Sequence, residues 1–208
     1  KTQSAVLEVM EERQVTIEGE THLCEEPFFV LATQNPIEYE GTYPLPEAQI
    51  DRFIMKLSTG YPRTIDEEKL IVERRIEWKK DDPTRDLKPV ISAEDFRALQ
   101  KVAENDIYID DVVINYIAEI VRNTREHPQV EVGSSPRGSL ALLKASRALA
   151  LLRGRDFVTP DDIKILATDA LAHRLILKVE DVMRRIDERK VVEKTLATVS
   201  VPKDYKPR

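Results

Sequence analysis

The sequence has few of the residues that covalent cross-links, metal sites and membrane spans require. Its 208 residues include a single cysteine, Cys24, which cannot form a disulfide within the chain. No apolar run approaches the ~20 residues of a membrane-spanning helix. The histidines His22, His127 and His173 lack the spacing typical of metal ligands. These absences predict a cytoplasmic protein with no membrane span and no metal site built from protein ligands.

Glycine and aromatic residues are also scarce. None of the 6 glycines is followed by lysine, so the chain lacks the G-x-x-x-x-G-K-[ST] loop that holds nucleotide phosphates. Aromatic residues make up 6% of the chain and charged residues 34%, which favours helices with solvated faces over an aromatic-rich β-sandwich. The net charge of -6 disfavours nonspecific nucleic-acid binding, although a local basic patch is compatible with it. The 41% of hydrophobic residues can supply a globular core.

The first 62 residues have the pattern of the end of an α/β domain. Residues 28–32 form a continuous apolar run, typical of a strand buried on both faces of a parallel sheet, and residues 54–57 repeat it more weakly. Residues 46–53 would be the helix between these strands. Polar and apolar residues alternate on both sides of Gly19, which predicts a β-hairpin over residues 14–24. Two strands and one helix cannot cover both faces of a sheet, so we expect further elements to precede residue 1.

Residues 63–178 are predicted to form a small helical bundle. Each expected helix begins at a residue whose side chain can cap it: Thr64, Ser92, Asp110, Ser135 and Thr159. Residues 179–208 are expected to hold a charged helix over 181–194, a β-prone stretch over 197–201 and a tail. The predicted fold class is therefore α/β followed by all-α.

Three polar residues are candidates for chemistry. Asn35 directly follows the apolar run 28–32, where an amide could orient a water at the carboxyl edge of a sheet, although Asn-Pro is also a common turn. Arg52 ends the short helix and could stabilise charge on a transferring phosphoryl group, or form an ordinary surface ion pair. Arg137 lies in the first turn of a helix, where the dipole disfavours a cation, so its position invites an anionic partner, although surface arginines also occur in first turns.

Together these motifs resemble the MoxR family of AAA+ ATPases. The resemblance is close over residues 1–62 and looser over the helical part to residue 178. The matching segments are residues 11–16, 32–36, 40–49 and 51–53, with residues 134–137 and 170–174 in the helical part.

The resemblance implies a role for each candidate. Asn35 would be sensor 1, the polar residue that positions the attacking water. Arg52 would be the arginine finger, which one subunit supplies to its neighbour's nucleotide, and Arg137 would be the sensor 2 arginine. The implied domains are the C-terminal part of a parallel-sheet AAA+ core with a β-hairpin in residues 1–62, a helical lid in 63–178, and a C-terminal helix and tail in 179–208.

The resemblance also implies an activity. The Walker A loop and Walker B acids of the family would precede Lys1, so we expect the chain to be the C-terminal part of a longer ATPase and to be inactive alone. ATP and Mg²⁺ would be bound mainly by the preceding part. The whole protein would be a hexameric ring whose ATP hydrolysis drives chaperone-like assembly or maturation of protein complexes, with a von Willebrand factor A domain protein as partner.

Two other functions stay open. One is a non-enzymatic helical interaction module with a vestigial ATPase segment; an upstream phosphate-binding loop and a hydrophobic run ending in Asp-Glu would favour the enzyme over it. The other is a helicase-type nucleic-acid motor. The acidic balance counts against a motor, as does a hairpin that carries Glu18 and Glu20 and no Lys or Arg.

Overall fold

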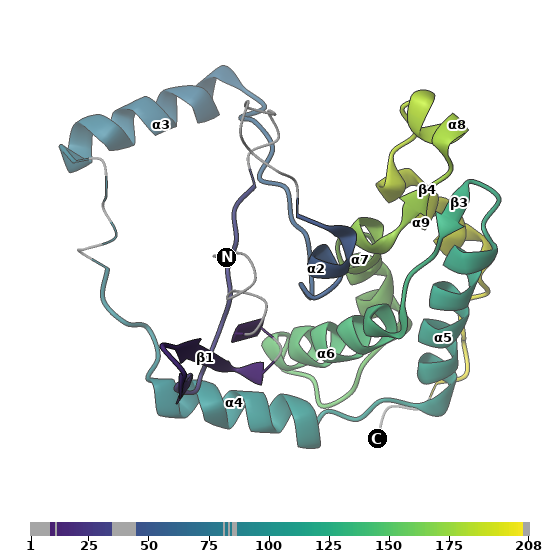
Figure 1. The fold of residues 1–208 in the computed structure, drawn as a ribbon, viewed down its shortest axis with the longest axis horizontal. Helices are drawn as coiled ribbons and strands as arrows, with labels where there is room; N and C mark the ends of the chain where they lie inside the picture. The colour runs from purple at the N-terminus through teal and green to yellow at the C-terminus, as the bar shows by residue number, and fades with distance from the viewer. Residues whose placement is uncertain are drawn as a thin grey trace.

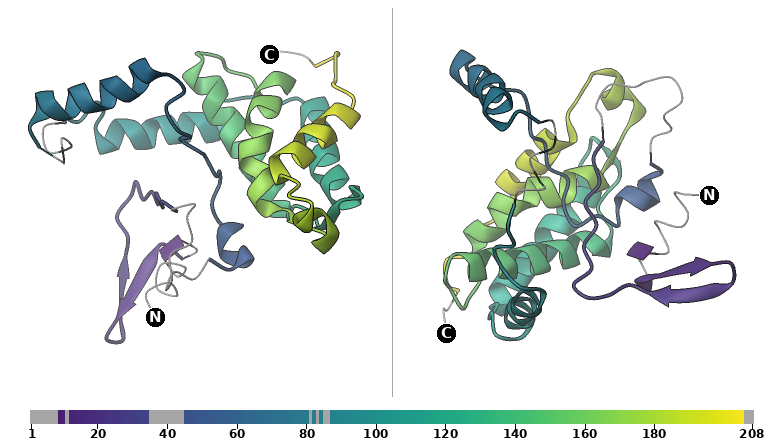
Figure 2. Two further views of the ribbon diagram at one scale, coloured as in Figure 1. Left: turned by 90° about the horizontal axis from the view of Figure 1, so that it is seen from above. Right: turned by 90° about the vertical axis from the view of Figure 1, so that its left-hand side faces the viewer.

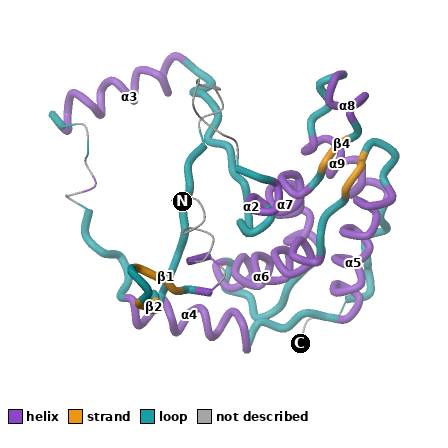
Figure 3. Tube along the Cα trace, viewed as in Figure 1, coloured by secondary structure: helices purple, strands orange, loops and turns teal. Residues whose placement is uncertain are grey.

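The computed structural model describes residues 9–10, 12–34, 45–80, 82, 84 and 87–205, most of them in helices (Figures 1 and 3). The helices are α2 (Glu47–Ile50), α3 (Ile65–Trp78), α4 (Ala93–Asn105), α5 (Asp111–Glu126), α6 (Pro136–Leu152), α7 (Pro160–Leu171), α8 (Val179–Met183) and α9 (Glu188–Thr198), with a 3-10 turn, η2 (Ala172–Arg174). The strands are β1 (Gln14–Ile17), β2 (Glu20–Leu23), β3 (Val130–Val132) and β4 (Ile176–Leu177). Helix-rich with small sheets, this composition agrees with the predicted fold class.

The predicted helix starts are confirmed, because each expected cap makes its hydrogen bond. The side chains of Thr64, Ser92, Asp110, Ser135 and Thr159 each accept a hydrogen bond from a backbone amide in the first turn that follows. Thr159 and Asp162 form a reciprocal capping box. Local side-chain chemistry therefore sets where α3 to α7 begin.

The core lies between α5, α6, α7 and α9. Tyr116, Ile120, Leu142, Ile163 and Leu171 are among its largest fully buried side chains. Each buried side chain of this kind contributes about 1.5–3 kcal/mol relative to an exposed one. Helix α9 contacts both α5 and α7, so it belongs to the same packed core. The domain boundaries expected at residues 62 and 178 stay predictions.

Two small antiparallel sheets accompany the helices. In the hairpin, β1 pairs with β2 in a register that places Gln14 opposite Leu23, as predicted. Glu18 and Gly19 both have positive φ, which a type I′ turn requires. The second sheet pairs β3 with β4 and fastens the end of α5 to the segment after η2. The hairpin projects away from the bundle, and α3 also extends from it (Figure 2).

The two expected parallel strands are absent from the described structure. Residues 28–32 and 54–57 lie outside any strand, and Phe29, Leu31 and Leu57 are exposed. An apolar run forms a buried strand only when neighbouring strands satisfy its backbone groups. Among the described residues, neither segment has such a neighbour.

The prediction for the C-terminal region is wrong in two respects. The helix expected over residues 181–194 is interrupted, because Arg185 takes a left-handed conformation and Asp187 caps a new helix, α9. Residues 197–198, expected to be β-prone, continue α9. Burial of Val191 and Val192 in the bundle stabilises this helix, and tertiary packing overrides the local β preference.

Candidate functional site

The segment that follows α2 meets the helical bundle at Asp51. The Asp51 carboxylate accepts a hydrogen bond from the Ser135 hydroxyl, at 3.1 Å to Oδ1 and 3.0 Å to Oδ2. It also accepts one from Arg174 Nη1, at 2.6 Å to Oδ1, and Arg137 Nη1 lies 3.5 Å from Oδ2. One carboxylate therefore contacts two guanidinium groups and the hydroxyl that caps α6.

Arg174, in η2, makes the most extensive contacts at this junction. Its Nη1 donates both to the carboxylate and to the main-chain oxygen of Asp51. Its Nη2 donates to the main-chain oxygen of Phe53 at 2.6 Å and lies 3.5 Å from that of Ile54. Its Nε donates to the main-chain oxygen of Ala170 at 2.7 Å. The Arg174 side chain is only 2% exposed, so the guanidinium is held inside the protein by the segment it binds.

Burial and charge act in opposite directions on Asp51. Burial opposes ionisation of its carboxyl, but the hydrogen bonds from Arg174 and Ser135 and the charges of Arg174 and Arg137 outweigh that effect and lower its pKa below the usual value. Asp51 is therefore an anion at neutral pH and the counterion of Arg174.

Arg137 occupies the first turn of α6, as predicted. Ser135 caps this helix by accepting a hydrogen bond from the Arg137 amide at 3.2 Å, and Pro136 begins it. The Arg137 side chain is 50% exposed, and its contact with Asp51 is longer than that of Arg174. The anionic partner that its position invites is, in this structure, the carboxylate of Asp51.

Arg52 lies between the residues that Arg174 holds. It is partly buried, and its Nε and Nη1 atoms are shielded from solvent. His173 adds a further contact to the same segment, since its Nε2 lies 3.1 Å from the main-chain oxygen of Phe53. Burial, followed by the charge of Arg174, lowers the pKa of His173, so the neutral imidazole is favoured there.

The structure places Arg137 against Asp51, the residue that precedes Arg52 in the chain, and Asn35 lies outside the described residues. No group of three or more His, Cys, Asp or Glu residues suitable for a metal ion occurs in the described ranges. Within those ranges, no helix is long and apolar enough to cross a membrane.

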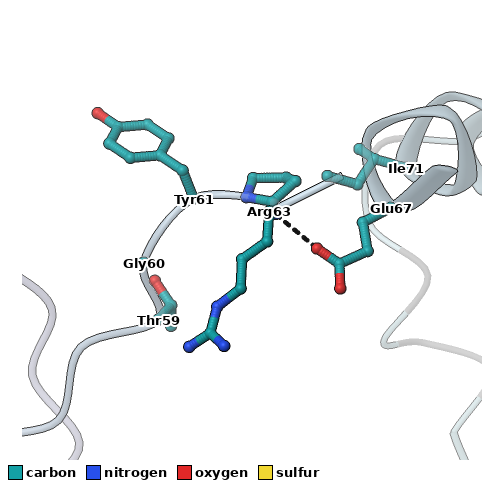
Figure 4. A pocket seen from close by; sticks show the side chains of 7 residues that line it. Thr59, Gly60, Tyr61, Arg63, Glu67 and Ile71 are labelled. Atoms are coloured by element: carbon teal, nitrogen blue, oxygen red, sulfur yellow. Dashed lines mark hydrogen bonds between the residues drawn. The ribbon is translucent and has the colours of Figure 1, made fainter. Parts of the chain in front are cut away.

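A hollow where the chain enters α3 is a weaker candidate site (Figure 4). Figure 4 shows one hydrogen bond in this hollow, from the Arg63 amide to Glu67 Oε2 at 2.6 Å. This bond lies at the start of α3. Tyr61 and Ile71 line the same hollow. It brings together no set of groups comparable to that at Asp51.

Sequence reasoning missed the roles of Asp51, Ser135 and Arg174 at this junction. In the sequence Asp51 is only the neighbour of Arg52, and Ser135 is only a helix cap. Arg174 lies in the run 170–174, to which the family pattern assigns no role. Their partners lie 84 and 123 residues away in sequence, so no local pattern reveals these contacts.

Comparisons with known proteins agree with this architecture. Residues 1–55 match the family described as "ATPase family associated with various cellular activities (AAA)", and residues 122–195 match the AAA lid domain. The chain is 50% identical to the uncharacterized protein YeaC of Bacillus subtilis over 97% of its own length and 62% of that protein. It is 40% identical to the chaperone MoxR1 of Mycobacterium tuberculosis over 97% of its length and 54% of that protein.

A solved structure gives the same result. The chain superposes on a candidate ATPase from Cytophaga hutchinsonii with a TM-score of 0.83 and 38% identity, over 97% of this chain and 62% of that one. The chain thus spans somewhat more than half the length of these relatives. The predicted fold class, the C-terminal part of an AAA+ core followed by a lid, is confirmed. The chain belongs to the MoxR family of AAA+ ATPases.

Proposed function

We propose that this chain is part of an ATPase that couples ATP hydrolysis to chaperone-like assembly or maturation of protein complexes. The observation that carries the proposal is the contact of Arg137 with Asp51, the residue next to Arg52. It places Arg137 against the residue that precedes Arg52, and the family pattern assigns both arginines to nucleotide. The chaperone name of the relative from M. tuberculosis supports the second half of the proposal.

The described residues fit a role toward the phosphates of ATP. Arg137 is half exposed and its pair with Asp51 is long, so an arriving phosphate could replace the carboxylate as its anionic partner. Arg52 would stabilise the negative charge that develops on the γ-phosphoryl group. Because Arg137 contacts the residue that precedes Arg52, we propose that both arginines serve one nucleotide, bound by a neighbouring subunit.

The attacking water, the phosphoryl group and Mg²⁺ would be held by groups other than Arg52 and Arg137. Asn35 would position the attacking water, and ATP would supply the phosphoryl group that is transferred. The chain contains no glycine followed by lysine, so we propose that these 208 residues alone bind ATP weakly and hydrolyse it poorly. Mg²⁺ would be held by ligands outside the described ranges, which offer no suitable cluster.

We further propose a cytoplasmic hexameric ring with a von Willebrand factor A domain protein as partner. A ring follows from the arginine finger, because a residue that acts on a neighbour's nucleotide requires a neighbour. A helicase-type motor and a purely structural interaction module are the competing functions. A structural module requires no ATP turnover. A helicase-type motor requires none in the absence of nucleic acid, so turnover without nucleic acid that depends on both arginines would favour the proposal.

The test is steady-state ATP hydrolysis by the full-length protein. Arg52→Ala should lower turnover by about 10³-fold while changing ATP affinity by no more than a few fold, because an arginine finger acts mainly in the transition state. Arg137→Ala should reduce the thermal stabilisation that ATP confers. Without ATP it should change stability by no more than about 1 kcal/mol, because the Arg137 side chain is half exposed and Asp51 keeps Arg174 as its counterion.

The matched control is Arg122→Ala, which removes an arginine on α5 that pairs with Glu126 and is 76% exposed. This variant should keep wild-type turnover and its response to ATP. Wild-type turnover in Arg52→Ala would contradict the assigned role, and so would an Arg137→Ala variant that loses stability equally with and without ATP.

A further inference from the structure

Arg174 holds the main chain on both sides of Arg52. It donates to the carboxylate and main-chain oxygen of Asp51, which precedes Arg52, and to the main-chain oxygen of Phe53, which follows it. A guanidinium has several donors in a fixed plane, so contacts on both sides of one residue restrict that residue in position and in orientation. Arg52 itself is not touched by these bonds.

Arg174 can be buried only while the segment after α2 is bound to the bundle. A guanidinium that is 2% exposed must have a counterion and hydrogen-bond acceptors, because an unpaired buried charge is strongly destabilising. In this structure the segment after α2 supplies the counterion, and α7 supplies one acceptor. Separating the segment from the bundle would leave the charge without its counterion.

Two further contacts attach residues 51–56 to the bundle. The amide of Lys56 donates to the main-chain oxygen of Asp169 in α7 at 2.9 Å. His173, the residue before Arg174, places its Nε2 near the main-chain oxygen of Phe53. The end of α7 and η2 therefore bind residues 51–56 at successive points along the chain.

Resting on the proposed function above, we propose that Arg174 is a positioning residue that attaches Arg52 to the lid, so that the arginine finger moves with the lid as one body. Movement of the lid then moves Arg52 relative to the nucleotide it serves. Arg174 acts through Asp51 and Phe53 and does not contact the nucleotide.

The test uses Arg174→Lys in the full-length protein. Lysine keeps the charge that Asp51 neutralises, so the variant should fold, but its single ammonium group cannot reproduce the planar set of contacts on both sides of Arg52. Turnover should fall by about 10- to 100-fold, as expected when a reacting group is displaced by about 1 Å. The KM for ATP should change by less than about threefold, because Arg174 does not bind ATP.

The matched control is Arg155→Lys. Arg155 also joins a buried carboxylate, Asp162 at 2.7 Å, to a main-chain oxygen, that of Phe157 at 2.9 Å, but it touches nothing in residues 51–56. It should lose some stability and keep turnover. Hydrogen exchange at the amides of residues 53 and 56 should accelerate in Arg174→Lys and stay unchanged in the control.

A double variant separates positioning from a general structural effect. If Arg174 acts through Arg52, then Arg52→Ala combined with Arg174→Lys should turn over within about twofold of Arg52→Ala alone. Losses that multiply in the double variant would overturn the inference. So would equal loss of turnover in Arg174→Lys and Arg155→Lys, or unchanged exchange at residues 53 and 56. Absence of ATP turnover in the unaltered protein would instead overturn the proposed function, and the exchange measurement would still decide whether Arg174 anchors the segment.

Discussion

The buried carboxylate of Asp162 provides a direct test of how the lid is stabilised. Asp162 is fully buried and contacts Arg153 Nη1 at 2.9 Å and Arg155 Nη2 at 2.7 Å. Its other oxygen accepts hydrogen bonds from the amide and hydroxyl of Thr159, both at 2.9 Å. This cluster connects the end of α6 to the start of α7. Arg137 lies in the first turn of α6, and Arg174 lies in η2, directly after α7. The perturbation is Asp162→Asn, which keeps the size of the side chain and removes its charge.

The expected loss follows from the burial of the partners. Removing one member of a fully buried ion pair costs about 3–5 kcal/mol. Arg153 and Arg155 have side chains that are 43% and 24% exposed, so water can partly replace the lost carboxylate. We therefore expect Asp162→Asn to lower the free energy of unfolding by about 2–3 kcal/mol, a large part of the 5–15 kcal/mol typical of a domain.

The measurement is urea unfolding followed by circular dichroism at 222 nm. For a slope of about 1–3 kcal/mol per molar urea, the midpoint should fall by about 0.7–3 M. The control is Asp161→Asn, one residue earlier, where the side chain is 80% exposed and pairs with Lys164 at 3.6 Å; it should cost less than about 1 kcal/mol. Equal losses in the two variants would refute the reasoning, because they would show that burial of the charge does not decide its contribution.

The pH dependence gives an independent check. Burial opposes ionisation of Asp162, but the bonds from Arg155 and Thr159 outweigh it, so its pKa in the folded protein lies below the usual value. A carboxyl with a lowered pKa contributes stability above the pKa of the unfolded chain, about 3.9, and loses it as pH falls through the lower folded value. The difference between wild type and Asp162→Asn should thus be full at pH 7 and shrink below about pH 4. A difference that stays constant down to pH 2 would contradict the assignment.

Two further predictions concern Gly138 and His173. An added Cβ at Gly138 would lie 2.1 Å from Ser134 Oγ and 2.9 Å from Leu171 Cδ2. Gly138→Ala should therefore destabilise the protein by about 1–3 kcal/mol, although alanine has the better helix propensity. A thermal melt that shows stabilisation would contradict this. Since burial and Arg174 lower the pKa of His173 in the folded protein, stability should fall as pH drops below about 6.5, where the unfolded histidine gains its proton first. Melts between pH 8 and pH 5 should show a weaker slope in His173→Gln than in wild type, and equal slopes in the two proteins would contradict this.

Local chemistry explains which parts of the fold could be predicted from the sequence. A cap such as Thr159 acts on an amide three residues away, so the pattern and its contact lie in one window. The hairpin around Gly19 was equally readable, because its turn type depends on two residues. Strand formation by residues 28–32 depends on neighbours that can lie anywhere in the chain, so it is not encoded locally. The break near Arg185 has one local signal, Asp187, whose side chain caps the start of α9.

The candidate site divides in the same way. Arg137 could be identified because Ser135 and Pro136 fix a helix start beside it, and a cation in the first turn is unusual enough to be noticed. Arg52 is a candidate from its place at the end of a short helix, but the sequence leaves an ordinary surface ion pair open there, and the family pattern supplies the arginine-finger role. Arg174 lies in a run that the pattern marks, but its contacts with Asp51 and Phe53 join residues 120 or more positions apart. Such a pairing becomes visible only when the fold brings its members together.

Charge composition alone does not separate the site from the rest of the lid. Asp162 and Asp51 are each a carboxylate that contacts two guanidinium groups. The partners of Asp162 lie only 7 and 9 residues away, so this cluster stabilises a connection that chain continuity already keeps together. Arg174 lies 123 residues from Asp51, so their contact fixes the relative position of two segments that could otherwise move apart. Substitution of Asp162 should therefore lower stability and leave the turnover of the folded protein unchanged, whereas Arg174→Lys should reduce turnover by far more than any loss of stability accounts for.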